Sequence, residues 1–326
     1  MLFRSVTAAE RLSGMHLEAA FVSVGGAHVA SENSKGLVAV GGQGREVSRE
    51  DVERVTEVAK AVSIPSSREI LHVVPRDFTV DGQEGVKDPL GMIALRLEVE
   101  THIVSGAAPA LQNLSKCVKL AEVRVDELVA NGIASAEAVL TDTERDLGVA
   151  VADIGAGTTD IVLFADGSPF HTAVLPLGGA NVTNDVAIGL KTSLAAAEEL
   201  KIAAGTADTR SIDPEEPLDE RFAELLEGRL PRRYDLAFCI EERMREIFEQ
   251  IGAEIEKGGR QRLPAGLVLT GGGALLGGVA DLGREVLGMP VRVAVPIGVT
   301  GLTDNLLSPQ YATAIGLLQW ASRVTA

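Results

Sequence analysis

The sequence LGVAVADIGAGTTDIVLF, residues 147–164, decides the fold class. An apolar run ends at Asp153, a turn with Gly155 and Gly157 follows, and a second apolar, β-branched run begins at Thr159. Two such runs around a glycine turn predict two strands of one sheet. After the turn signal ADGS, the run FHTAVLPLGG adds a third strand, so we expect a meander with two glycine corners.

This glycine turn contains the residue types that hold a phosphate. Glycine permits close backbone approach, so N–H groups near Gly155 and Gly157 can point at phosphate oxygens. The hydroxyls of Thr158 and Thr159 add donors, and Asp153 can orient a water that is bound to Mg²⁺ or attacks the substrate. A hairpin whose glycines serve only the turn explains this string equally well.

A second glycine motif, LVLTGGGALLGGV at 267–279, predicts a strand that feeds a glycine loop at the start of a helix. Ligands meet backbone amides at such places. The spacing is neither GxGxxG nor GxxxxGK[ST], which disfavours a Rossmann dehydrogenase and a Walker NTPase. Close packing of a strand on a helix would also explain these glycines.

Two weaker features stand between these motifs. In AAEELKIAAG, Glu198 and Lys201 are three residues apart on one helix face, as in an ordinary surface ion pair. Gly178, Gly179 and Asn181 follow LPL and could form a plain turn. Their order along the chain, more than any one of them, gives the set its weight.

The remaining elements follow from periodicity and turn residues. Helices are expected to end at Gly14 and to cover 48–65, 107–121, 133–140, 182–190, 195–204, 240–258 and 279–287. Strands are expected at 19–26 and 36–42, which could pair as a hairpin, at 69–75 and 95–104 around a polar loop, and at 125–129. The acidic stretch 206–220 is expected to be a solvated loop.

Composition narrows the function classes. With 46 acidic and 30 basic residues the formal charge is −16, which disfavours general nucleic-acid binding. Hydrophobic residues are 46% and aromatic residues 3%, as expected for an aliphatic α/β core. Cys117 and Cys239 are in no metal-type pattern and are expected to be buried, reduced thiols. No run reaches the length of a membrane span or a secretory signal, so a cytoplasmic chain is expected.

The strings DIGAGTTDI, LPLGGANVTNDVAIGL, AEELK, VLTGGGALLGG and SPQYATAIGLL, in this order, resemble the actin and heat-shock chaperone ATPase superfamily. EILHVVPRDFTVDGQEGVKDPLGM and HIVSGAAPALQNLSKCV are similar to the FtsA family of bacterial cell-division proteins within it. The resemblance covers nearly the whole chain. It implies an actin-like α/β fold of two ribonuclease H-like lobes with ATP and Mg²⁺ between them, and an FtsA-type inserted subdomain.

The resemblance also implies a division of the chain. Its expected parts are a remnant of the first lobe (1A) at 1–21, the SHS2-like inserted subdomain (1C) at 22–100, the first lobe again at 101–147, the second lobe (2A) at 148–190, its outer subdomain (2B) at 191–245, and the second lobe with a return helix at 246–326.

The resemblance also implies roles for the residues of this sequence that match the family's motifs. Asp153 would orient water and Mg²⁺, and would be a tentative catalytic residue. The resemblance assigns Gly155, Gly157, Thr158 and Thr159 to a second phosphate loop, Gly178, Gly179 and Asn181 to the next phosphate corner, Glu198 and Lys201 to ribose and adenine, and Gly271, Gly272, Gly273 and Ala274 to an adenosine-side loop.

Three features depart from the family pattern. No DxGT-type first phosphate loop precedes Asp153. This is expected if the sequence is a fragment, if its start was assigned too late, or if the protein is a variant with half a phosphate clamp. Asn131, in ANGIASA, replaces an acid that could polarise the attacking water. The family's amphipathic membrane helix is not found after Arg323, so membrane attachment is expected only through a helix outside this sequence.

The resemblance implies an ATP-binding scaffold on the cytoplasmic face of the membrane at the division septum. It would polymerise with itself through the inserted subdomain and second lobe, and link the FtsZ ring and other division proteins to the membrane. ATP hydrolysis would be slow at most. The alternatives are an active ATPase or kinase of the same superfamily and a pilus-assembly scaffold.

Overall fold

The computed structural model describes residues 2–41, 44–61, 64–259, 263–300 and 306–325. The meander is confirmed: β9 (Val149–Ile154), β10 (Thr159–Ala165) and β11 (Ser168–Leu175) are antiparallel neighbours. β12 (Leu267–Thr270) and β13 (Val291–Val293) extend the sheet in parallel on the other side of β9, giving the order β11-β10-β9-β12-β13.

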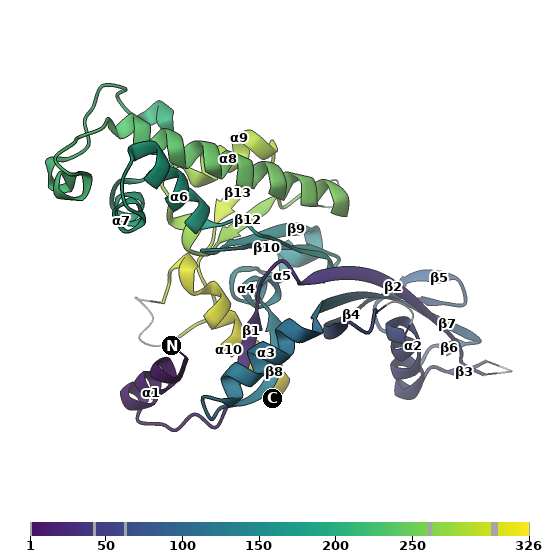
Figure 1. Ribbon diagram of the computed structural model, residues 1–326. Coiled ribbons are helices and arrows are strands. Elements are labelled where there is room, and N and C mark those ends of the chain that lie inside the picture. The colour runs from purple at the N-terminus through teal and green to yellow at the C-terminus, as the bar shows by residue number, and fades with distance from the viewer. Residues whose placement is uncertain (1, 42–43, 62–63, 260–262, 301–305, 326) are drawn as a thin grey trace.

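Four helices lie on one side of this sheet, with α7 packed against α6, and together with the sheet they form what we call the second lobe (Figure 1). They are α6 (Gly179–Leu190), α7 (Leu194–Ala204), α8 (Arg233–Gly258) and α9 (Val279–Leu287). The periodicity that predicted α8 is confirmed, because Ile240, Met244, Ile247, Phe248, Ile251 and Ile255 are all buried.

The acidic stretch between α7 and α8 is only partly solvated. It contains the short 3-10 turn η1 (Thr209–Ser211), followed after residue 219 by η2 (Glu220–Phe222) and η3 (Glu224–Leu226). Ile212 and Leu218 within it are buried against the lobe. The expectation of a solvated loop was therefore wrong at these two apolar positions, since the acidic residues around them hide their contribution to the core.

The inserted subdomain is a four-stranded antiparallel sheet covered by one helix. The sheet has the order β2 (Ala30–Ala39), β7 (Arg96–Ala107), β4 (Arg68–Val80), β5 (Gln83–Val86). Helix α2 (Arg49–Ala61) packs closely on it, since a Cβ at Gly36 would lie 2.2 Å from the Val55 carbonyl oxygen. A small ribbon of β3 (Arg45–Glu46) and β6 (Ile93–Ala94) lies at its far end (Figure 1).

The predicted hairpin of 19–26 with 36–42 does not form. β1 (Ala19–Val24) pairs in parallel with β8 (Arg124–Ala130), whereas β2 pairs with β7. The two runs look alike locally because both are apolar and β-branched, but they belong to different sheets. β2 alternates so that one side faces α2, while β1 lies between helices of the first lobe.

The predicted polar loop after residue 75 was also wrong in part. β4 continues to Val80 and turns back at Asp81 and Gly82, both with positive φ, into β5. An Asp-Gly pair with positive φ at both residues is the usual tight hairpin turn, so the polar residues stand on strands.

The first lobe contains the β1–β8 sheet with α3 (Ala108–Lys119), α4 (Asn131–Val139) and α10 (Ala312–Thr325), while α1 (Leu2–Ser13) and α5 (Asp142–Leu147) flank it. Helices α4 and α10 cross closely, because a Cβ at Gly316 would lie 1.7 Å from the Ala134 carbonyl oxygen. Cys117 is exposed on the outer face of α3 and Cys239 is half-buried, so the expectation of two buried thiols was wrong. Among the described helices none combines the length and apolar character needed to cross a membrane.

Candidate functional site

A cavity of about 390 Å³ lies where two glycine turns of the second lobe face α7. We call it the glycine-turn cavity. It is lined by six of the residues singled out in the sequence: Gly155, Gly179, Glu198, Lys201, Gly272 and Gly273. The structure thus brings together all four motifs, which are spread over more than a hundred residues of the chain.

The two turns are held against each other by contacts that only glycine allows. Gly271 has φ +83°, and a Cβ there would lie 2.3 Å from Oδ1 of Asp153. A Cβ at Gly273 would lie 2.4 Å from the Ile154 side chain. The turn GGGALL therefore packs directly on the end of β9, and a substituted residue would push it away.

The corner before α6 is docked on the first turn in the same way. The N–H of Gly179 donates to the carbonyl oxygen of Gly155 at 2.9 Å, and that of Ala180 donates to Ala156 at 2.8 Å. A Cβ at Gly178 would lie 2.6 Å from the same Gly155 oxygen. Gly178 is thus required for the contact between the two turns, although it does not line the cavity.

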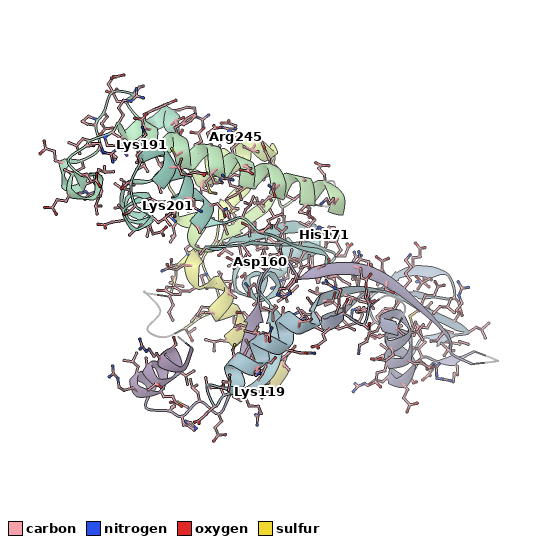
Figure 2. All side chains as sticks on the ribbon, viewed as in Figure 1. Lys119, Asp160, His171, Lys191, Lys201 and Arg245 are labelled. Atoms are coloured by element: carbon pink, nitrogen blue, oxygen red, sulfur yellow. The ribbon has the colours of Figure 1, made fainter. Side chains whose placement is uncertain are left out.

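Lys201 is the cation of the cavity. Its ammonium donates to Glu198 at 2.7 Å, to the Thr183 hydroxyl at 2.9 Å and to the Gly179 carbonyl oxygen at 3.1 Å. Burial raises the pKa of Glu198, but hydrogen bonds from Lys201 and Thr183 outweigh it, so the pKa is lowered and the carboxylate is ionised. Lys201 therefore stands at the α6 corner as well as on α7, where it is labelled in Figure 2.

The other predicted site residues lie behind the lining. Asn181 accepts a hydrogen bond from the Gly178 N–H, so its side chain caps α6, and the buried Thr159 hydroxyl donates to the Leu177 carbonyl oxygen. Both contacts match the alternative in which these residues serve the turns alone. The remaining predicted residues outside the lining are Asp153, Gly157, Thr158, Gly178, Gly271 and Ala274.

Asp153 and Asp160 are paired across β9 and β10 and form the acidic part of the site. Burial raises the pKa of Asp153, although hydroxyls of Ser135 and Thr313 donate to it. Burial and the nearby Asp153 raise the pKa of Asp160 to about 7, against hydrogen bonds from Thr158 and Asn131. Figure 2 shows Asp160 beside α4, on the side of the sheet that faces the first lobe.

Several residues of the cavity were missed in the sequence. Ile202 and Leu275 are 74% and 55% exposed, yet they line the cavity, as do Ala156, Gly205, Met244, Leu276 and Gln310. Apolar residues at helical spacing predict a core, so nothing marked this apolar wall. For Asp160 a signal existed, since it is the second acid of DIGAGTTDI, seven residues after the first.

The arrangement suits a ligand with two unlike ends. Exposed apolar side chains at Ile202 and Leu275 can cover a flat ring, while the glycine turns and Lys201 can bind an anionic end. Within the described ranges no group of three or more His, Cys, Asp or Glu side chains is placed to hold a metal ion.

Known families match both halves of the chain. The family model described as the SHS2 domain inserted in FtsA matches residues 26–105, and the one described as cell division protein FtsA matches residues 150–316. The cell division protein FtsA of Pseudomonas aeruginosa is 42% identical over 321 residues, 97% of this chain and 76% of the relative. That of Escherichia coli K12 is 35% identical over 328 residues, 97% of this chain and 77% of the relative.

Solved structures agree on the fold. A chain of the PilM-PilN type IV pilus biogenesis complex has a TM-score of 0.65 at 18% identity, over 97% of this chain and 83% of the other. MreB 5 of Spiroplasma citri has a TM-score of 0.52 at 14% identity, over 67% of this chain and 66% of the other. These similarities confirm the predicted actin-like α/β fold with an inserted SHS2 subdomain.

Proposed function

Because this chain belongs to the FtsA family of cell division proteins, we propose that its glycine-turn cavity binds ATP. The observation that carries the proposal is the meeting of two glycine turns with Glu198, Lys201 and an exposed apolar wall in one cavity. The structure of MreB 5 has AMPPNP bound, which is support from a distant relative of the same fold.

The predicted residue roles fit this proposal with two changes: Lys201 moves from the ribose and adenine to the phosphates, and five residues act indirectly. Gly155, Gly179 and Lys201 would face the phosphates, Glu198 the ribose, and Gly272 and Gly273 the adenosine, with Ile202 and Leu275 against the base. Asn181, Thr159, Gly178, Gly271 and Ala274 would act indirectly, by fixing the turns. The apolar wall suits a planar base because apolar side chains gain from covering its faces.

Mg²⁺ fits the donor set, although Asp153 and Asp160 do not line the cavity. Magnesium in proteins is usually bound by one or two carboxylates together with waters and substrate phosphates. Asp153, acting through water, would help to hold the ion, which would neutralise phosphate charge. A nearby cation would also favour the ionised forms of both acids, whose pKa values are raised.

Thermal unfolding with nucleotide tests the proposal. Millimolar ATP with Mg²⁺ should raise the melting temperature, because a ligand that binds only the folded state stabilises it. The variant Gly273→Val should lose this shift, since a side chain there meets Ile154. Gly82→Val, at the β4–β5 turn outside the site, controls for a general glycine effect. A wild-type chain with no shift would contradict ATP binding in this cavity.

We further propose a scaffold role: self-assembly through the inserted subdomain and second lobe, binding to FtsZ, and a place at the cytoplasmic face of the division septum. Exposed apolar side chains on both regions support self-contact, Ile93 at 73% and Ile188 at 77% exposed. Sedimentation with ATP should pellet the wild type, and Ile93→Asp should stay in the supernatant. Sedimentation with purified FtsZ, and a fluorescent fusion at midcell, test the other two parts.

The rival functions are an active ATPase or kinase and a pilus-assembly scaffold. The pilus-assembly role is supported by the similarity to a chain of the PilM-PilN complex, which is 18% identical in sequence to this chain. A cell division protein is 42% identical to it. For the enzymatic reading, Asn131 stands where an acid could polarise the attacking water, and it donates to Asp160 instead. Phosphate release well above that of Asp153→Ala would favour the enzyme.

A further inference from the structure

The carboxylate of Asp153 is held by two hydroxyls from outside its own sheet. Thr313 Oγ donates to Oδ2 of Asp153 at 2.8 Å, Ser135 Oγ donates to the same oxygen, and the two hydroxyl oxygens lie 2.9 Å apart. Ser135 is fully buried and Asp153 is 7% exposed. Burying an ionised carboxylate is costly without hydrogen-bond donors, so these two hydrogen bonds fix the orientation of the carboxylate.

The two hydroxyls come from the helices that cross between the lobes. Ser135 is on α4, next to Ala134, and Thr313 is on α10, one turn before Gly316. The absence of a side chain at Gly316 lets α10 rest on the Ala134 carbonyl, and this places both hydroxyls on one carboxylate oxygen. Any sliding of α10 along α4 would therefore change the donors that Asp153 receives.

We propose that Ser135 and Thr313 are positioning residues that aim Asp153 toward a Mg²⁺-bound nucleotide and tie it to the crossing of α4 and α10. The inference rests on the proposed ATP binding and deepens it. Neither residue lines the cavity, and neither touches the ligand in this proposal. In this proposal they act on the magnesium-dependent part of binding, since Asp153 is the one of the three that is assigned to the ion.

The test compares ATP affinity without and with magnesium. A fluorescent ATP analogue is titrated into the full chain in EDTA and at millimolar Mg²⁺, for wild type, Ser135→Ala, Thr313→Val and Thr313→Ser. Loss of one bond to a charged group is expected to reduce the magnesium-induced gain in affinity about tenfold in the first two variants. Affinity in EDTA should change less than about twofold, which is within the spread expected for residues that do not contact a ligand.

Thr313→Ser keeps the hydroxyl and should keep the wild-type gain. A purely structural role would lower the melting temperature of Thr313→Val but leave the ratio of the two affinities unchanged. An unchanged ratio of the two affinities, together with normal ATP binding, would overturn this inference and leave the proposed function standing. A wild-type chain that binds no ATP in either buffer would overturn the proposed function, and the inference with it.

Discussion

The second lobe meets its two neighbours through joints of opposite chemistry. Toward the inserted subdomain the contact is polar: Ser31 donates to the Thr172 carbonyl oxygen, Asn33 donates to that of Phe170, and His102 bridges Asn33 and Thr172. Toward the first lobe the contact is mainly apolar and tight, with α4 and α10 on the other side of the five-stranded sheet, and its polar part is the pair of hydroxyls on Asp153. A Cβ at Gly132 would lie 2.7 Å from Val162.

The two joints differ in how freely they can move. Hydrogen bonds fix direction as well as distance, so a few polar groups specify the angle of the inserted subdomain. Aliphatic packing has no preferred direction in the plane of contact, and we expect the lobes to rotate there when the cavity is filled. Near His171, labelled in Figure 2, the polar joint meets β11, the strand that leads to Gly178 and Gly179.

The largest expected effect disturbs the crossing of α4 and α10, the two first-lobe helices that face the second lobe. Gly316→Ala places a methyl group against the Ala134 backbone, which cannot move aside as a side chain could. We expect the free energy of unfolding to fall by about 3–4 kcal/mol, as for severe overpacking. Urea unfolding measures it. The control is Gly252→Ala on α8, where the nearest atom is the flexible end of Leu287, and whose cost should be below about 1 kcal/mol. Equal costs would contradict the close crossing.

The next effect breaks the polar joint. His102→Ala removes a fully buried ring and leaves Asn33 and Thr172 without their partner. The expected loss in unfolding free energy is about 2–3 kcal/mol, from the cavity and the unsatisfied groups. His171, next to Thr172 on β11, forms a partly exposed pair with Glu254 of α8, and His171→Ala should cost about 1 kcal/mol or less. If the two variants lose the same stability, the joint does not depend on its buried hydrogen bonds.

A smaller effect weakens the inserted subdomain away from its joint. Asp51, with no exposed side-chain surface, accepts hydrogen bonds from Arg45, Arg54 and Ser48, and those from Arg45 and Ser48 hold its pKa well below the usual range. Asp51→Ala should lower the unfolding free energy by about 2 kcal/mol and leave ATP binding unchanged. Glu57→Ala removes only the surface pair with Lys60 and should cost under about 0.5 kcal/mol. A change in ATP affinity would mean that the two regions are coupled.

The last effect is a change in how the unfolding free energy depends on pH. Burial lowers the pKa of His102 from 6.5 to about 3, so between these values the unfolded chain binds a proton that the folded chain refuses. This group therefore removes about 1.4 kcal/mol of stability per pH unit as the pH falls below 6.5. For His102→Gln, the plot of unfolding free energy against pH should be shallower by that amount between pH 6.5 and 4.5. Asp160→Asn should shift the slope in the opposite sense, because the folded-state pKa of Asp160 is raised to about 7. A wild-type slope in His102→Gln would contradict a neutral buried ring.

Sequence reasoning succeeded where the residue pattern depends only on nearby residues of the chain. The β9–β10–β11 meander and α8 follow from local periodicity, and the glycines of the site follow from turns that need them. It failed where the partner lies far along the chain. β1 and β8 are about a hundred residues apart, and no local signal separates a parallel partner from a nearby hairpin. No residue pattern marked Ile202 and Leu275 as the apolar wall of the cavity.

Hydrogen exchange of the backbone amides, with and without ATP and Mg²⁺, tests the central claim most directly. Binding in the glycine-turn cavity should slow exchange in the three turns around Gly155, Gly179 and Gly272, while α2 of the inserted subdomain stays unchanged and serves as the internal reference. Bound ATP that leaves these turns unprotected, or that protects another surface instead, would contradict the account.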